Sequence, residues 1–577
     1  MRRSLKAVYG ELGEVDPAAA FEAGRGRKFV YQLFDGGSCL VELDESPPRE
    51  MNQQALEAAI EIALLLGARV LDEVHTMRKT VIDGSSPTAF QRTALVAVNG
   101  KLKTSFGGVG IPTVCVEEES AGIVEREAGE VTYRLDRLGI PLVEIATDAS
   151  ISSGAQAREV AEKIGLLLRN AGRVQRGIGS IRQDVNVSIE GGARVEVKGV
   201  QELNQLSRIV EIEARRQAKL IEIKRELEKR LGARSGWKKL LVKNVSKIFS
   251  NTDCKLIKKA ITQGSEVVGV LLPGFAGVLG VELTPGHRMG KELSDYAKAK
   301  TGVSGLIHSG EELGKYGISR EEAHNVGWAL ECGGGDGWAI CVAEEAIAKK
   351  SLEAALERAV YAVEAGVPKE TRRAEGETTV FMRPLPGSAR MYPETDVPPV
   401  RVSNALVQRI TAGLPESFEE KITRLVDGRG LGRQLAEAVV KSGRLQEFEG
   451  LLEKTGAEPV LVATTLLQTL VALSREGVEV QKISVEELEK SLSGVARGEI
   501  VKAALPAVLR GIAGGKDFHR VVREGKFEKI SGRRLAKIIG ELKGSGRVFE
   551  EIMREHRLNL DPTELNELLK SFKQKKR

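Results

Sequence analysis

The stretch RLDRLGIPLVEIATD, residues 134–148, holds an apolar run typical of a β-strand, with one carboxylate, Glu144, inside it. The neighbours of that carboxylate are Leu142, Val143, Ile145 and Ala146. Burying a lone carboxylate among such side chains is costly unless a partner lies beside it. We therefore expect a metal ion, an arginine or a lysine next to Glu144, and a structural ion pair explains the pattern equally well.

A row of three carboxylates comes shortly before, in VCVEEESAG, residues 114–122. Glu117, Glu118 and Glu119 follow an apolar, strand-like run and repel one another unless a cation or basic groups hold them. Strand alternation puts Glu118 on the face opposite Glu117 and Glu119, so only part of the set can point into one site. Taken alone, the segment favours an acidic surface turn.

Two further segments alternate polar and apolar residues apart from the polar Gln183, IRQDVNVSI at 181–189 and VEVKG at 195–199. The polar positions are Arg182, Asp184, Asn186, Ser188, Glu196 and Lys198. One face of each predicted strand is thus lined by groups that can hold Mg²⁺ and phosphate. An amphipathic sheet facing solvent is the alternative, but the mixture of both charge signs favours a nucleotide site.

Any ATP site must differ from a P-loop, because the sequence contains no G-x-x-x-x-G-K-[ST] motif. The turn-forming stretch DGSSPTAFQRT, residues 83–93, supplies Gln91 and Arg92, which suit phosphate or ribose contacts. Taken alone, it is an ordinary loop.

The composition indicates a large multidomain globular protein. With 577 residues, 42% of them hydrophobic and 29% charged, the chain can form several cores in three or four domains. Its apolar segments are too short to span a bilayer and no signal peptide is evident, so we expect a cytoplasmic protein that is not bound to a membrane.

The order of patterns predicts α+β organisation followed by helices. In the first 215 residues, β-type runs at Cys39–Glu42 and Arg194–Lys198 surround a helix at Asn52–Leu66. A long helix is predicted at Ser207–Leu231. A self-contained α+β module follows up to about residue 366, with helices at Ser319–Glu331 and Ser351–Ala365.

The remainder begins with RPLPGSARMYPETDVPP, residues 383–399, which is too rich in proline for a regular helix and either links domains or lines a site. Residues 405–505 are predicted to be helical, with breaks at Gly428–Gly432 and at Gly443.

A final helical unit, residues 515–572, belongs to a basic region that repeats Lys and Arg from Lys516 to Lys543 and ends in Lys573, Lys575, Lys576 and Arg577. Such a field attracts a polyanion, although solvated faces of a thermostable protein are an equal alternative.

These segments together resemble the family of tRNA-dependent amidotransferase B and E subunits. The patterns that carry the resemblance occur in the family's order: MRKTVIDGSSPTAFQRT, VEEESAG, YRLDRLGIPLVEIATD, RVQRGIGSIRQDVNVSI, RVEVKGVQ and RMYPETDVPP. An inserted part resembles the insertion domain of bacterial-type aspartyl-tRNA synthetases through GFAGVLGVEL, GKELSDYAK and GVSGLIHSGEEL. That insertion points to the E subunit, the archaeal form.

The resemblance implies a multidomain α+β fold. A mixed-sheet cradle catalytic domain would occupy residues 1–265 and be completed by 378–402, with an inserted α+β aspartyl-tRNA-synthetase-like domain at 266–377. Two all-α domains would follow, a helical domain at 403–505 and a basic tail domain at 506–577. In the family such helical and tail domains embrace the tRNA elbow.

The implied activity uses ATP and Mg²⁺ to phosphorylate the γ-carboxylate of glutamate esterified to tRNA(Gln), after which ammonia displaces phosphate. Phosphorylation is needed because a carboxylate is a poor electrophile. The chain shows no constellation of nucleophiles for releasing ammonia. The resemblance therefore implies an asparaginase-like D subunit as partner, in a heterotetramer of two D and two E chains.

Site residues follow by matching motif. Glu118, with Glu117 as the alternative, and Glu144 would be Mg²⁺ ligands, while Arg182 and Asp184 would act in catalysis. Nucleotide contacts would come from Arg182, Glu196, Lys198, Gln91 and Arg92.

One departure from the family concerns the start, RRSLKAVYGELGEVD, which lies beyond the family's opening G-L-E-[IV]-H strand. Two causes stay open, a reading frame that starts too late and a true loss of the strand. Favouring the first, we expect weak metal binding and weak activity in this chain, and recovery in a version extended upstream in frame. A non-catalytic tRNA-binding protein of the same descent is the main alternative. A relative of aspartyl-tRNA synthetase would instead form an aminoacyl adenylate, but no class II catalytic signature supports it.

Overall fold

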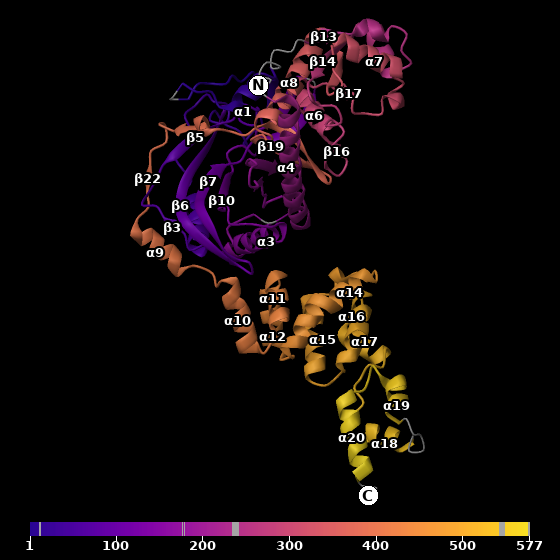
Figure 1. The fold of residues 1–577 in the computed structure, drawn as a ribbon. Helices are drawn as coiled ribbons and strands as arrows, with labels where there is room; N and C mark the ends of the chain where they lie inside the picture. The colour runs from indigo at the N-terminus through magenta and orange to yellow at the C-terminus, as the bar shows by residue number, and fades with distance from the viewer. Residues whose placement is uncertain are drawn as a thin grey trace. The chain divides into compact units, whose positions relative to one another are not determined.

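The computed structural model describes residues 1–10, 13–127, 129–175, 177, 179–232, 242–541 and 548–574. Residues 572–574 are described by their backbone alone. They form two compact units, Met1–Pro415 and Glu416–Arg577, which are described separately (Figure 1). The predicted multidomain α+β class with mixed sheets is confirmed. The expected basic side chains of Lys543, Lys573, Lys575, Lys576 and Arg577 lie outside what the structure describes.

The first unit contains a six-stranded antiparallel sheet. Its strands run in the order β10 (Pro141–Ala146), β7 (Gly107–Glu118), β6 (Phe90–Thr104), β5 (Thr76–Thr80) and β21 (Met391–Pro393), and β3 (Arg69–Val70) also pairs with β6. The stretch around Glu144 is therefore a strand, as its apolar run predicts. Strand β21 comes from the proline-rich segment, which thus returns to this sheet.

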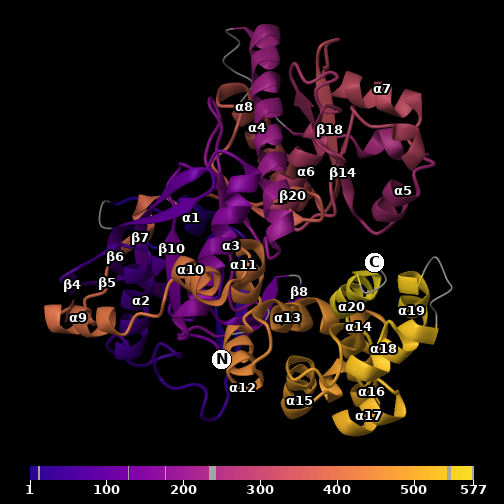
Figure 2. The same ribbon diagram turned by 90° about the horizontal axis from the view of Figure 1, so that it is seen from below.

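One face of this sheet is covered by α2 (Gln53–Leu65), which lies against β6 and β7 (Figure 2). The Asn52 side chain caps the helix by accepting a hydrogen bond from the Ala55 amide at 3.0 Å. Leu56 and Ile60 pack there against strand residues such as Val96. The opposite face carries the carboxylates of Glu117 and Glu144, with Leu142 and Cys115 beside them.

A second sheet is mixed. It contains β11 (Val185–Val187), β12 (Val195–Lys198), β19 (Glu370–Glu375) and β20 (Thr378–Pro384), with only β12 and β19 parallel. Val195 and Val197 pack on the long helix α4 (Leu203–Leu231). Of the strand predicted over residues 181–189, only three residues form β11, so Arg182 and Asp184 lie in the segment before it.

The inserted module is built on β13 (Lys243–Asn244), β14 (Glu266–Leu272), β18 (Gly337–Ala343) and β17 (Ile307–His308). Its helices are α5 (Lys255–Thr262), α6 (Met289–Thr301), α7 (Arg320–Ala329) and α8 (Glu345–Glu364). Because β13 pairs with β14 and α5 packs on the same sheet, the folded module begins before residue 266.

The module is not self-contained, which corrects the prediction from sequence. Phe275, Leu293 and Leu352 of the module share one buried core with Leu220 of α4. Strand β19, all of which falls within the predicted insertion, belongs to the second sheet by its pairing with β12.

A further four-stranded sheet lies near the N-terminus, with the order β1 (Arg2–Arg3), β2 (Lys28–Gln32), β9 (Glu130–Arg134) and β8 (Gly122–Glu127). The strand predicted at Cys39–Glu42 is wrong, because these residues form turns. The Glu42 carboxylate accepts a hydrogen bond from the Cys39 amide at 2.6 Å, which folds the segment back on itself.

Helix α9 (Asn404–Ala412) belongs to the first unit, because Ile410 and Val402 pack in the core formed by α2. The helical part of the chain that folds separately therefore begins at Glu416 rather than at residue 403.

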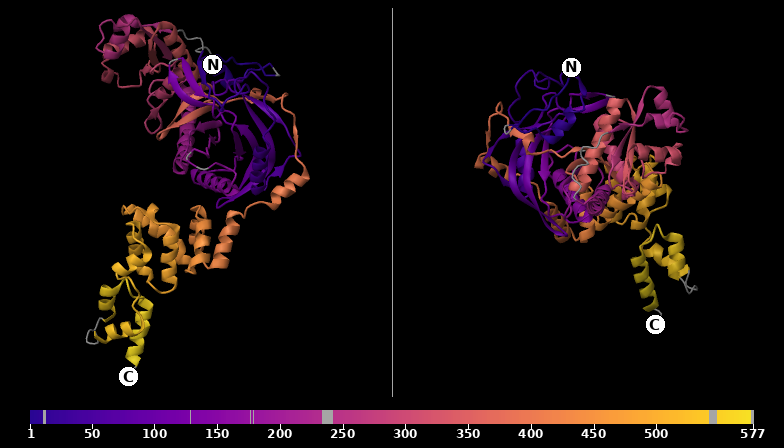
Figure 3. Two further views of the ribbon diagram at one scale, coloured as in Figure 1. Left: turned by 180° about the vertical axis from the view of Figure 1, so that it is seen from behind. Right: turned by 45° about the horizontal axis from the view of Figure 1, so that its top comes forward.

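The second unit is helical, and Figure 3 shows its helices in orange to yellow. Its larger part contains α10 (Phe418–Arg429), α11 (Arg433–Lys441), α12 (Leu445–Thr455), α13 (Pro459–Thr464), α14 (Leu470–Arg475), α15 (Val485–Ala496), α16 (Leu505–Ala513) and α17 (Phe518–Glu524). The predicted break at Gly428–Gly432 falls between α10 and α11, and Gly443 lies between α11 and α12.

The last helices are α18 (Gly532–Glu541), α19 (Val548–His556) and α20 (Pro562–Gln574), which share a small core of their own. That core begins at Ile530, whereas Phe518 and Val522 belong to the larger helical core. The tail as folded therefore starts later than residue 506. Among the described helices, none combines the length and apolar character needed to cross a membrane.

Candidate active site

Strand register collects several charged side chains on the polar face of the six-stranded sheet. Glu144 lies opposite Cys115, and Glu117, two residues further along β7, therefore shares its face. Lys79 of β5 forms an ion pair with Glu117. The side chains of Glu117 and Glu144 are close enough to share a hydrogen bond.

Glu144 is exposed, contrary to the expectation that its apolar strand would bury it. Alternation turns Val143 and Ile145 towards the cores around α2, so the carboxylate between them points to the polar face. Crowding by surrounding protein atoms and the negative charge of Glu117 raise the pKa of Glu144, against the opposing effect of Lys79 and Lys198.

Glu118 lies on the opposite face, towards α2. The Arg92 guanidinium is 3.6 Å from Glu118, and its Nε donates to Glu394 at 3.0 Å. Burial raises the pKa of Glu118, although Arg92 opposes this. Glu118 and Arg92 thus form part of an ion-pair network on the covered face. The structure brings Glu117, and not Glu118, together with Glu144.

Arg182 is held by the third glutamate of the row. It forms a two-pronged contact with Glu119, with Nη1 donating to Oε1 at 3.1 Å. Arg137 also donates to Glu119, at 2.9 Å. Burial opposes ionisation of Glu119, but Arg182, the Ser120 amide and Arg137 together hold the pKa of Glu119 below its ordinary value. Gln91, for its part, donates its amide to the backbone carbonyl of Glu118 at 2.6 Å.

The second sheet carries the mixed charges that its sequence predicts. Lys198 lies 2.6 Å from Asp184 and 3.4 Å from Glu196. Burial works against the charged lysine, yet Glu196 and Asp184 raise the pKa of Lys198. Burial likewise disfavours the charged form of Glu196, but Lys198 and a hydrogen bond from Thr371 hold the pKa of Glu196 below its ordinary value. Both shifts favour the charged forms of Lys198 and Glu196.

The two polar faces interact electrostatically, because the positive charge of Lys198 on the second sheet counteracts part of the rise in the pKa of Glu144 on the first. Three residues of this region are missed by reasoning from the sequence. Lys79 stands just before the turn-forming loop at 83–93, and Arg383 opens the proline-rich segment. Thr371 reaches Glu196 through the parallel pairing of β12 with β19, for which the sequence offers no local signal.

A magnesium ion would find two carboxylates here. Within the described ranges, no three His, Cys, Asp or Glu side chains cluster to hold a metal. Mg²⁺ needs only one or two carboxylates when waters and phosphates complete its shell. The adjoining Glu117 and Glu144, with the pKa of Glu144 raised by its neighbour, have the like-charge repulsion that a cation would relieve. These two side chains fit the ion.

Comparison with known proteins places the chain in a family. Residues 39–408 match the family model described as the GatB/GatE catalytic domain, and these residues include every side chain of the two polar faces.

Curated relatives match over most of their length. A protein of Methanopyrus kandleri is 47% identical over 521 residues, which are 90% of this chain and 81% of the relative. One of Methanocaldococcus jannaschii is 43% identical, covering 96% of this chain and 86% of the relative. One of Pyrococcus horikoshii is 44% identical, covering 94% and 85%. Each is named as the E subunit of glutamyl-tRNA(Gln) amidotransferase, and the chain belongs to that family.

Proposed function

We propose that the chain converts glutamate carried on tRNA(Gln) into glutamine, using ATP and ammonia. Membership of the family identifies it as an amidotransferase subunit of the ligase class. The observation that supports the finer proposal is the pair of facing charged groups. Glu117 and Glu144 lie with Lys79 on one sheet, and Lys198 lies between Asp184 and Glu196 on the other.

The reaction needs two steps because hydroxide is a poor leaving group. The γ-phosphoryl group of ATP would pass to a carboxylate oxygen of the glutamyl group, which gives an acyl phosphate and ADP. Ammonia would then add to the carbonyl carbon, and inorganic phosphate would leave as the amide forms and a proton is released. Positioning and charge stabilisation are what the protein must supply.

The geometry suggests how its residues divide these tasks. Glu117 and Glu144 would hold Mg²⁺, which when bound neutralises charge on phosphate oxygens. Lys79 fixes the carboxylate of Glu117. Lys198, kept protonated by Asp184 and Glu196, would contact phosphate or acyl oxygens. Arg182 is already occupied by Glu119 and would instead hold the segment that leads to β11.

Partners follow from the chemistry. The substrate would be tRNA(Gln) charged with glutamate, acting in the cytoplasm, where translation consumes the product. Ammonia would come from an asparaginase-like D subunit, in an assembly of two D and two E chains. The relatives are each named as one lettered component of an amidotransferase, which supports the existence of a partner chain.

The test compares three glutamine variants in the complex with its partner. Glu144→Gln and Glu117→Gln should lower ATP-dependent amidation of Glu-tRNA(Gln) by about two to three orders of magnitude, since each removes a charge that acts on the transferring phosphoryl group. Glu118→Gln is the matched control on the other face and should retain most activity. Affinity for tRNA should stay near wild type in all three.

Two results would contradict the proposal. If Glu118→Gln lost activity while Glu117→Gln retained it, the active site would lie on the opposite face of the sheet from the one proposed. Absence of any ATP hydrolysis dependent on Glu-tRNA(Gln), with tight tRNA binding, would support the non-catalytic alternative.

A further inference from the structure

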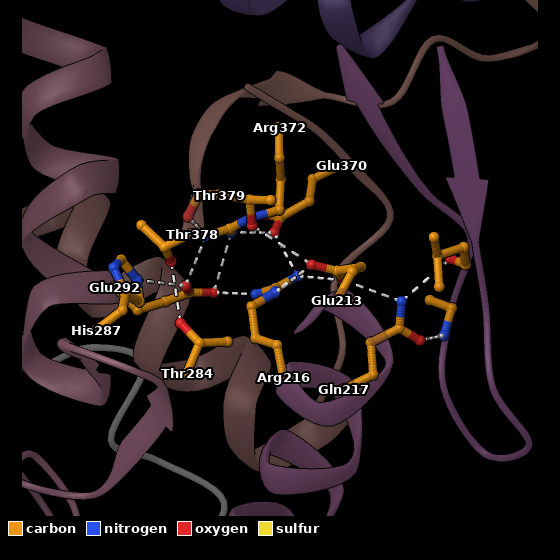
Figure 4. A network of polar contacts seen from close by, with 12 residues as sticks. Glu213, Arg216, Gln217, Thr284, His287, Glu292, Glu370, Arg372, Thr378 and Thr379 are labelled. Carbon is orange, nitrogen blue, oxygen red and sulfur yellow. Dashed lines mark hydrogen bonds and ion pairs between the residues drawn. The ribbon is translucent and has the colours of Figure 1, made fainter. Parts of the chain in front are cut away.

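A cluster of six buried charges lies beneath the second sheet, and Figure 4 shows five of them, all but Arg358. Each of these side chains is at most 1% exposed. Three are arginines and three are glutamates: Glu213, Arg216, Glu292, Arg358, Glu370 and Arg372. Because the charges balance, the cluster is not an anion or cation site but a joint between elements.

The joint connects the inserted module to the sheet. Arg216 of α4 donates to Glu213 at 2.9 Å and to Glu370 of β19 at 2.9 Å. Glu292 of α6 accepts from Arg372 of β19 at 3.2 Å and from Arg358 of α8 at 3.1 Å. The guanidiniums of Arg216 and Arg372 therefore each bridge carboxylates of different elements, while Arg358 ties α8 to Glu292, and these contacts fix the relative positions of the elements.

The neighbouring Gln217 extends the joint to the strands that carry Glu196 and Asn186. Its amide donates to the Val187 carbonyl at 3.1 Å and to Glu213 at 3.0 Å. Its carbonyl accepts from the amides of Ile189 and Ala193, both at 3.4 Å. The hairpin between β11 and β12 is thus held by the same group of side chains (Figure 4).

Strand β19 passes between the joint and the candidate active site. Glu370 and Arg372 point into the joint, so Thr371 between them points to the other face. There its hydroxyl donates to Glu196 Oε2 at 2.9 Å, a shorter contact than the 3.4 Å between Glu196 and Lys198.

A bulge in β20 brings Arg383 to the same face. Arg372 pairs with Phe381, while Thr371 pairs with Arg383, so β20 has one extra residue between them. Without that residue, Arg383 would point into the joint. The Arg372 guanidinium donates to the hydroxyl and to the carbonyl of Thr379, both at 2.7 Å, and so holds the bulged strand.

We propose that Thr371 is a positioning residue, whose hydroxyl orients the Glu196 carboxylate in the active site and which the buried joint holds in register. This inference rests on the proposed function of the Glu196 and Lys198 pair. Without the hydroxyl, Glu196 can turn fully towards Lys198 and hold that ammonium away from the substrate.

The experiment measures steady-state amidation by the full chain with its partner subunit. Thr371→Val removes the hydroxyl and keeps the shape. It should lower kcat by about tenfold, as expected for one hydrogen bond to a charged group, and change the KM for ATP little. Thr371→Ser restores the hydroxyl and should recover most of kcat. Thr371→Ala provides the same comparison if the valine variant does not fold.

Thr378→Val is the matched control. It lies in the same sheet, but its hydroxyl contacts Thr284 at 2.9 Å and not the site. The inference is overturned if Thr371→Val keeps wild-type kcat, if Thr371→Ser is equally impaired, or if Thr378→Val loses as much. Glu196→Gln separates a failure of the Thr371 proposal from a failure of the proposed function. Full activity in Glu196→Gln would show that the Glu196 and Lys198 pair does not take part in the reaction.

Discussion

Single side chains show where strand alternation outweighs composition. The sequence correctly separates Glu118 from Glu117, because adjacent residues of a strand point to opposite faces, while Glu119 lies beyond the end of β7. It does not say which face is the polar one, so it cannot place Glu117 rather than Glu118 beside Glu144. The decision depends on where α2 packs, which is a tertiary fact. Glu118 as a Mg²⁺ ligand, which the family motif implies, stays a prediction.

Glu196 provides a test of the second polar face through pH. Its pKa in the folded protein lies below the ordinary 4.5. Its contribution to stability is therefore present above about pH 4.5 and is lost as pH falls through the folded-state pKa. Glu196→Gln should lower the free energy of unfolding by roughly 1 kcal/mol at pH 7.

Urea unfolding at several pH values measures this difference. The gap between Glu196→Gln and the wild type should narrow below about pH 4.5, where the native carboxylate takes up a proton. A gap that widens as pH falls would mean that the interactions of Glu196 with Lys198 and Thr371 do not stabilise the charged form.

Whole elements divide into those that sequence can predict and those that it cannot. Periodicity predicts α2 and α4 because each buries one stripe of apolar side chains over several turns. Periodicity does not predict the turn at Cys39–Glu42, because a local side-chain hydrogen bond competes with β-pairing there. Nor does it predict the pairing of β12 with β19, because the whole inserted module separates the two strands in sequence.

The buried joint between α4, α6 and β19 should be sensitive to the loss of a single charge. Glu292→Gln leaves Arg216, Arg358 and Arg372 short of a carboxylate in a site without water contact. Breaking a buried pair in this way costs about 3–5 kcal/mol. Chemical unfolding of the first unit should therefore shift to much lower denaturant concentration.

A surface pair of the same module is the control. Glu312 and Lys315 form an ion pair with both side chains 74% exposed. Exposed pairs contribute little to stability, so Glu312→Gln should leave the unfolding midpoint unchanged. An equal loss of unfolding free energy in Glu292→Gln and Glu312→Gln would show that the joint does not support the fold.

At the scale of the whole molecule, charge and chemistry lie on different parts of the chain. The candidate active site is confined to the unit Met1–Pro415, whereas the basic bias of the sequence falls in the second unit. A protein that acts on the end of a long polyanion needs binding contacts away from the reacting group. Contacts to phosphates supply this affinity without recognition of the bases. The helices α18–α20 have their own small core and can present such a surface.

The last prediction concerns Arg533 and Arg534, which are exposed on α18. If both contact tRNA phosphates, replacing both by glutamine should weaken tRNA binding and reduce the slope of log K against log[salt] by about two. The control is the pair Arg510 and Arg520, which already face Glu476 and Glu524, and its replacement should change the slope less. Filter binding of tRNA(Gln) over a range of salt concentrations measures both. Because Leu535 and Ile539 remain to form the core, a loss of affinity would reflect charge rather than unfolding. Identical slopes for wild type and the Arg533 and Arg534 variant would instead mean that these arginines belong to a solvated face, of the kind that stabilises proteins at high temperature.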